Sequence, residues 1–176
     1  MSGRHELKIE FFPVDNGDMA LLTLESGSTI LVDINIRQAA DDEDDDDAVD
    51  VAQLLRERLD RDSQGRLYVD GFLLTHPDED HCRGLTRHFH LGKPQDWSKK
   101  DDKILIREMW SSPIIFRRKK DIEGALCEDA EERWSEARRR ANLYKSTREK
   151  SSIGDGDRLQ VLGEDKDGKT DAKATN

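Results

Sequence analysis

The sequence predicts an α/β fold in which a mixed β-sheet is flanked by outer helices. Short apolar, β-prone segments come first along the chain, and helical segments then alternate with further strands. Apolar residues make up only 34% of the 176 residues, whereas charged residues make up 39%. The core must therefore be small, or it must be completed by something outside this chain. The length allows one domain of ordinary size, or a domain with a tail.

The first three strands are predicted at 7–12, 20–25 and 29–34, because these segments are apolar and β-prone. An Asp-Asn-Gly-Asp turn separates the first two strands, and a Ser-Gly-Ser turn separates the second from the third. Short strands joined by such turns are typical of an antiparallel meander. The acidic run 41–47 follows and should be a solvated loop insertion, because its seven carboxylates repel one another.

Two longer helices are predicted from apolar residues that recur at helical spacing, one over 48–61 and one over 128–149. A short helix is expected from Leu85 onward. Further strands are predicted at 68–75, 104–110 and 158–162. The segment 164–176 has no apolar residue larger than alanine, so we expect a disordered polar tail or a cut interdomain loop after a domain that spans 1–163.

A dense group of metal-competent side chains directly follows the predicted strand at 68–75. Within six residues lie His76, Asp78, Asp80 and His81. A strand end is rigid and the loop after it can curl, so these side chains can point into one small volume. Imidazole and carboxylate are ligands that suit zinc, manganese and iron. This density favours a metal site over an ordinary polar loop, and Gly84 would let the backbone turn closely behind it.

The net charge of -10 is carried mostly by the acidic run 41–47. Residues 133–150 hold seven Lys and Arg against two Glu, so a polyanionic partner is not excluded. The candidate phosphate contacts are Arg138, Arg139, Arg140, Lys145 and Arg148. The alternative is a solvated helix face, with the apolar stripe formed by Trp134, Ala137, Ala141 and Tyr144.

The sequence argues against a membrane or secreted protein. No apolar run approaches the roughly 18 residues that a membrane span needs. The N-terminus has no apolar stretch long enough for a secretory signal. Two cysteines, Cys82 and Cys127, do not make a disulfide framework. We therefore expect a cytoplasmic protein.

The motif at 75–81 resembles the signature of the metallo-β-lactamase fold, H-x-H-x-D-H after a buried strand. This chain has Asp78 where most members have their second histidine. The variant H-x-D-x-D-H, followed by a glycine, is similar to the hydrolase domain of the ComEC type, part of a DNA-uptake channel protein and read as a nuclease. The segments 12–22 and 30–33 resemble the opening strands of that subgroup, although Asp33-Ile34-Asn35 stands where the family usually has Asp-x-Gly.

The resemblance implies an αββα sandwich of which this chain is the N-terminal half. It implies two divalent metal ions, zinc or manganese, with His76 and Asp78 on the first and Asp80 and His81 on the second. Asp80, His76 and His81 would be the catalytic residues, and Asp33 would support them through hydrogen bonds. The activity implied is metal-dependent phosphodiester hydrolysis, with DNA as the substrate and defence against foreign DNA as one use.

Further metal ligands come later in that family, so the C-terminal half of the fold is expected as a separate chain. A trypsin-like protease could produce it by cutting at Lys166, Lys169 or Lys173. A homo-oligomer is left open.

Two other functions also stay open. One is hydrolysis of a small phosphodiester or ester on the same fold. The other is a non-catalytic metal-binding module that regulates a partner.

Overall fold

A computed structural model describes residues 6–14, 17–37, 49–112 and 126–162. These residues form an α/β fold with a mixed sheet, as the sequence predicts. Seven of the eight strands among the described residues belong to this sheet, whereas the short strand Ile34–Asn35 lies outside it and makes isolated bridges to Cys82 and Arg83. The strands are β1 (Lys8–Phe11), β2 (Ala20–Thr23), β3 (Thr29–Val32), β4 (Ile34–Asn35), β5 (Tyr68–Leu73), β6 (Phe89–His90), β7 (Ile104–Ser111) and β8 (Arg158–Val161). The α-helices are α1 (Val51–Arg58), α2 (Glu79–Cys82), α3 (Leu85–His88) and α4 (Glu128–Ser146), and the short 3₁₀ helices are η2 (Pro94–Asp96) and η5 (Lys150–Ser152).

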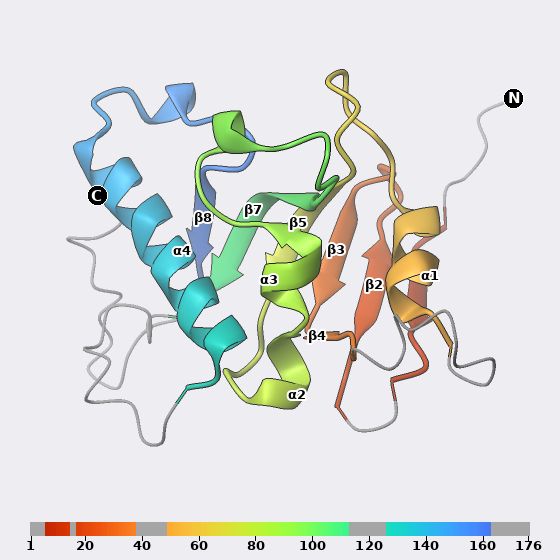
Figure 1. The fold of residues 1–176 in the computed structure, drawn as a ribbon. Helices are drawn as coiled ribbons and strands as arrows, with labels where there is room; N and C mark the ends of the chain where they lie inside the picture. The colour runs from red at the N-terminus through yellow and green to blue at the C-terminus, as the bar shows by residue number, and fades with distance from the viewer. Residues whose placement is uncertain (1–5, 15–16, 38–48, 113–125, 163–176) are drawn as a thin grey trace, which may run out of the picture.

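The sheet begins with the antiparallel meander β1-β2-β3, which confirms the prediction from the turn residues. It continues with parallel pairing of β3 with β5 and of β5 with β7. Both β6 and β8 also pair parallel to β7, at its beginning and its end. The carboxyl ends of β3, β5 and β7 therefore meet at one edge of the sheet, the lower edge in Figure 1.

The elements differ from the predicted ones at their ends and in two short additions. The helix predicted over 48–61 begins after Asp50, whose carboxylate accepts a hydrogen bond from the Gln53 backbone amide at 2.7 Å. The strand predicted at 68–75 ends two residues early, at Leu73. A single helical turn, α2, stands where a loop was predicted, and the two-residue strand β6 was not predicted at all.

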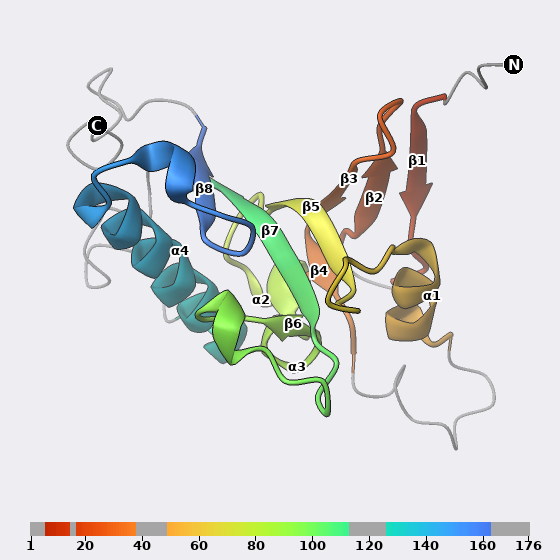
Figure 2. The same cartoon turned by 90° about the horizontal axis from the view of Figure 1, so that it is seen from above.

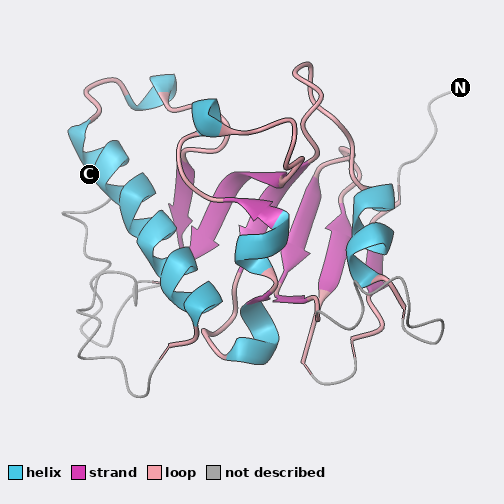
Figure 3. Cartoon of the chain, viewed as in Figure 1, coloured by secondary structure: helices cyan, strands magenta, loops and turns pink. Residues whose placement is uncertain are grey.

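The helices lie on one side of the sheet and cover its core face (Figures 1–3). One row of paired strand residues points toward them, and these side chains are at most 1% exposed: Leu21, Leu31, Phe72 and Met109. Side chains alternate along a strand, so the neighbouring rows point to the other face. That face is also apolar, but the following side chains there are only partly buried: Leu22, Ile30, Val32, Leu73 and Trp110.

Several predicted features lie outside the described residues. These are the acidic run 41–47, the tail 164–176 and its three lysines Lys166, Lys169 and Lys173. Within the part of the chain that is described, each helix is too short or too polar to cross a bilayer.

Candidate metal centre

The predicted metal motif lies at the edge where the parallel strands end. Asp33 directly follows β3, and His76 comes three residues after β5, the strand beside it. In open α/β sheets this carboxyl edge is where ligands bind, because the loops that leave the strands can converge there. Figure 1 shows α2, which carries Asp80 and His81, just beyond the same edge.

Asp33 is the centre of the hydrogen-bond network. Its side chain is 2% exposed, and its backbone φ of 55° is left-handed, a conformation that aspartate adopts more readily than most residues. Its backbone amide donates to the Leu73 carbonyl oxygen at 2.9 Å, which continues the β3–β5 pairing. Its carboxylate accepts from the Thr75 backbone amide at 2.7 Å and from the Thr75 hydroxyl at 2.6 Å.

The Asp33 carboxylate orients both histidines. The Nδ1 atom of His81 lies 3.0 Å from Asp33 Oδ2, and Nδ1 of His76 lies 2.9 Å from the Thr75 hydroxyl that donates to Asp33. Since the hydroxyl proton goes to Asp33, the oxygen accepts from His76. Both imidazoles are then protonated on Nδ1, which leaves each Nε2 lone pair for a metal ion.

Two further carboxylates face these Nε2 atoms. Asp78 Oδ2 lies 3.6 Å from His76 Nε2, and Asp80 Oδ2 lies 3.8 Å from His81 Nε2. Two atoms bound to one ion, each about 2.1 Å from it, lie roughly 3.0–3.4 Å apart. Both pairs therefore need only a small adjustment to share an ion. The Asp78 side chain is 71% exposed and the Asp80 side chain 46%, so the group opens to solvent on the side of Asp78.

The structure therefore contains a His/Asp group that could hold a metal ion. Asp33, His76 and His81 each offer a ligand atom, and these atoms lie within 4.8 Å of one another. The rings of the two histidines are close, with centroids 3.6 Å apart. All four residues of the sequence motif are at this edge, together with Asp33. Thr75 was missed as a functional residue, although its place between a buried strand and the first histidine could have indicated it.

Two glycines allow the motif loop to pack tightly. A Cβ on Gly17, which has φ 97°, would lie 2.2 Å from the Asp80 carbonyl oxygen. The backbone at Gly17, before β2, therefore packs directly against the motif. A Cβ on Gly84, with φ 90°, would lie 2.8 Å from the Ile36 carbonyl oxygen. The role predicted for Gly84, a close backbone turn behind the site, is confirmed. These approaches exclude any side chain at either position.

Helix α4 holds the motif from behind through two contacts. The Asp129 carboxylate accepts from the backbone amides of Gly84 and Thr86, both at 2.8 Å. The thiols of Cys82 and Cys127 lie side by side, with their sulfur atoms 3.4 Å apart. Burial is the main cause that raises the pKa of the Cys82 thiol well above its ordinary value. Cys82 is therefore an uncharged, packed residue in this state rather than a metal ligand.

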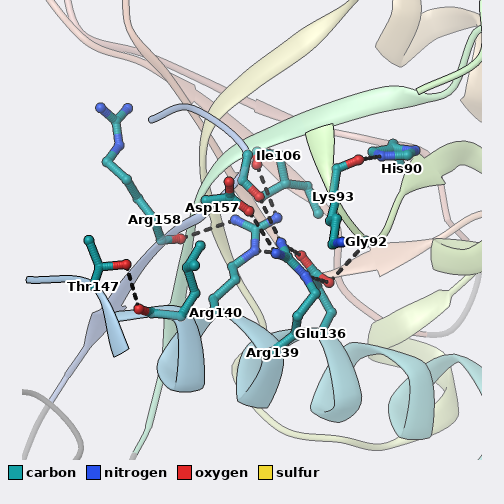
Figure 4. Close-up of polar contacts among 12 residues, drawn as sticks. His90, Gly92, Lys93, Ile106, Glu136, Arg139, Arg140, Thr147, Asp157 and Arg158 are labelled. Carbon is teal, nitrogen blue, oxygen red and sulfur yellow. Dashed lines mark hydrogen bonds and ion pairs between the residues drawn. The ribbon is translucent and has the colours of Figure 1, made fainter. Parts of the chain in front are cut away.

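The basic surface predicted on α4 needs a correction. Arg140 is 1% exposed and donates to Glu136 and to the carbonyl oxygens of Ile106 and Arg158 (Figure 4). Arg139 is held by Glu136 and Asp157, each at 2.7 Å. Arg140 therefore cannot reach a nucleic acid, and Arg139 is already neutralised.

Arg139 and Arg140 are unavailable for a nucleic acid because α4 buries a salt-bridge network instead of a purely apolar stripe. Burial alone would raise the pKa of Glu136, but the hydrogen bonds and charges of Arg139 and Arg140 outweigh it and lower that pKa. The remaining candidates are Arg138, whose guanidinium lies over the Trp134 ring at 4.5 Å, and the exposed residues Lys145 and Arg148.

Comparisons of the chain with family models, with curated proteins and with solved structures found no match.

Proposed function

We propose that this protein is a metal-dependent hydrolase of phosphodiesters, most specifically a nuclease that acts on DNA. The observation that supports the proposal is the cluster of Asp33, His76 and His81, with Asp78 and Asp80 at its open side. The donor set of imidazoles and carboxylates fits zinc or manganese. The cluster also lies at the edge of the sheet where α/β enzymes bind their ligands.

In this proposal two ions are bound, the first by His76 and Asp78 and the second by Asp80 and His81. Bound divalent cations supply a nucleophilic water at neutral pH and offset the charge that develops on phosphoryl oxygens. Asp33 keeps both imidazoles in the tautomer that exposes Nε2, because it accepts the Nδ1 proton of His81 and, through Thr75, fixes that of His76. The exposed Asp78 and the half-buried Asp80 leave the site accessible to a large substrate.

We also propose the metallo-β-lactamase arrangement, in which a second half of the fold packs against the open face of this sheet. That face carries Leu22, Val32, Leu73 and Trp110, all partly buried, and Phe11, which is 79% exposed. Apolar rows of this size are typical of a face that another layer covers. The second half would supply the additional metal ligands. A cytoplasmic location and activation by a protease stay predictions.

Cleavage of linear plasmid DNA tests the proposal. We expect wild-type protein, together with its second half, to cut DNA with added manganese or zinc, and the His76→Ala and Asp80→Asn variants to lose at least 100-fold in rate. Asp101→Asn is the matched control, because Asp101 lies in the turn before β7, at the opposite end of that strand. Equal rates for Asp80→Asn and Asp101→Asn would contradict the proposal.

The same assay separates the competing functions. A chromogenic phosphodiester cleaved under conditions that leave DNA intact would favour a small-molecule hydrolase. Metal binding without cleavage of either substrate would favour a non-catalytic module.

A further inference from the structure

Strand β1 forms one edge of the sheet, and among the described residues it pairs only with β2. Figure 2 shows it as the outermost strand, on the side of the sheet away from β8 and α4. The Phe12 backbone amide donates to the Met19 carbonyl oxygen at 3.0 Å, which continues the pairing with β2. Because these bonds alternate along an antiparallel strand, the N–H and C=O groups of Ile9 and Phe11 point outward. Such an edge can pair with a further strand.

The same edge carries a row of exposed apolar side chains. Leu7, directly before β1, is 56% exposed, Ile9 is 50% exposed and Phe11 is 79% exposed. Five large apolar side chains of the described residues are exposed, and three of them lie in this row. Exposed apolar surface is therefore concentrated at this edge, as is typical of a protein contact.

The sequence of the edge is complementary to itself in the antiparallel direction. When Ile9 of one copy lies opposite Ile9 of a second copy, each Leu7 lies opposite a Phe11. In the same register, each Lys8 lies opposite a Glu10. Lysine on an edge strand usually discourages pairing with another chain. Here it would face a carboxylate, and opposite charges directly across an antiparallel pair stabilise that pair.

We infer that two copies of this chain pair through β1, antiparallel about a two-fold axis at Ile9, so that one sheet runs through the dimer. Both copies use the same surface, as a two-fold symmetric interface requires. The two Ile9 residues exchange both of their backbone hydrogen bonds, because their N–H and C=O groups point outward. Glu10 contacts Lys8 and Arg58 of its own chain, so the contact joins the ion pairs of both copies into one network.

The dimer contact goes beyond the proposed function and does not depend on it. The second half proposed above would cover the face of the sheet, whereas this contact uses the backbone at its edge. Ile9 pairs with Leu22, so its side chain lies on that same face, and the apolar face would continue from one copy into the other.

Analytical ultracentrifugation of the full chain tests the dimer. A strand pair is a small interface, so we expect reversible dimers with a dissociation constant on the order of 10–100 µM. Ile9→Pro removes the outward N–H and no bond to β2, so it should weaken dimerisation about tenfold or more. Lys8→Glu places like charges opposite each other and should weaken it about threefold or more. Val49→Ser, which changes an exposed apolar side chain outside β1, should leave the affinity unchanged.

Disulfide cross-linking tests the register, in a Cys127→Ser background that keeps only the buried Cys82 as a native thiol. Ile9→Cys should give a covalent dimer with diamide, which takes up the two hydrogens, because paired Cα atoms about 5.5 Å apart suit a disulfide. Leu7→Cys is the matched control, since it is similarly exposed on the same face. Its two copies would lie about 13 Å apart along the strands, so cross-linking should be about tenfold slower or more.

A chain that stays monomeric at about 1 mM would overturn the inference. A dimer that a folded Ile9→Pro variant leaves unchanged would also overturn it and would place the contact on another surface, such as the apolar face. Thermal unfolding shows whether Ile9→Pro keeps the fold. If it does not, Lys8→Glu decides, because it changes only an exposed side chain, and unchanged dimerisation of that variant would count against the contact. Equal cross-linking rates for Ile9→Cys and Leu7→Cys would refute the register.

Discussion

At the scale of single residues, Asp33 links the two strand ends to the candidate metal ligands. It is almost fully buried, and its carboxylate meets Thr75 and His81 at hydrogen-bond distance. The sequence indicated Asp33 only as a supporting residue by family resemblance. The contact with Thr75 could not be predicted, because it depends on the parallel pairing of β3 and β5, which are separated by a long connection.

Asp33→Asn should weaken metal binding about 10- to 100-fold, because an amide holds the Nδ1 proton of His81 less strongly than a carboxylate does. Calorimetric titration with manganese or zinc measures the effect. The Asp101→Asn variant, altered in an exposed turn, should bind as the wild type does. An Asp33→Asn variant with undiminished affinity would show that Asp33 does not orient the ligands.

Gly17→Ala should destabilise the fold by more than the roughly 1–2 kcal/mol that a left-handed backbone costs an alanine. The added Cβ would meet the Asp80 carbonyl oxygen at 2.2 Å. Gly27→Ala is a matched control, since Gly27 also has a positive φ but no atom within 4 Å of the new Cβ. Urea unfolding compares the two variants, and equal losses of stability would refute the close packing of the first loop on the motif.

At the scale of elements, the sequence located most strands and both long helices, but it misassigned the buried face of α4. The prediction assigned the buried face of this helix from apolar residues alone, so it placed all the arginines on the solvent-exposed faces. The observed buried face alternates small and charged residues: Ala130, Arg133, Glu136, Ala137, Arg140 and Ala141. Charged positions at helical spacing look like a solvated face until their partners from other elements are known. Here the partners of the arginines include backbone carbonyl oxygens of Trp110, Ile106 and Arg158.

Glu136→Gln should cost about 3–5 kcal/mol of stability, because it leaves the buried guanidinium of Arg140 without its counter-charge. The pKa of Glu136 is lowered in the folded state, so its contribution is present above the unfolded value of about 4.3 and is lost as the pH falls through the folded pKa. Unfolding measured from pH 7 down to 3 should show a smaller acid loss for the variant. Identical acid profiles would contradict this assignment.

Mild oxidation should join Cys82 and Cys127, whose sulfur atoms lie 3.4 Å apart. A disulfide bond is about 2.0 Å long, so a small shift of α2 against α4 suffices. The thiol-specific oxidant diamide takes up the two hydrogens. The expected result is the loss of two titratable thiols without a covalent link between molecules, and Cys127→Ser should prevent it. Oxidised protein that is linked only between molecules would show that the two thiols are not neighbours.

At the scale of the whole molecule, the described helices cover one face of the sheet, the opposite face carries partly buried apolar side chains, and one edge holds a His/Asp group that could bind a metal ion. The low apolar content of the sequence predicted a small core or one completed from outside, and the partly buried side chains of Leu22, Val32 and Leu73 on the second face agree with the second possibility. The motif itself was predictable because its candidate ligands lie within six residues of one another in the sequence. The burial of Asp33 and His81 was not predictable, because it comes from strands and helices that are distant along the chain.

The central claim is that the edge of this sheet holds divalent metal ions. Calorimetric titration of the full chain with manganese and zinc tests it most directly, with a His76→Ala and His81→Ala double variant as the comparison. The account predicts saturable binding to the wild type and raised thermal stability, by about 2.7 kcal/mol at a metal concentration 100 times the Kd. It also predicts that both effects disappear in the double variant. A wild type that binds neither ion, or a double variant that binds them equally well, would contradict it.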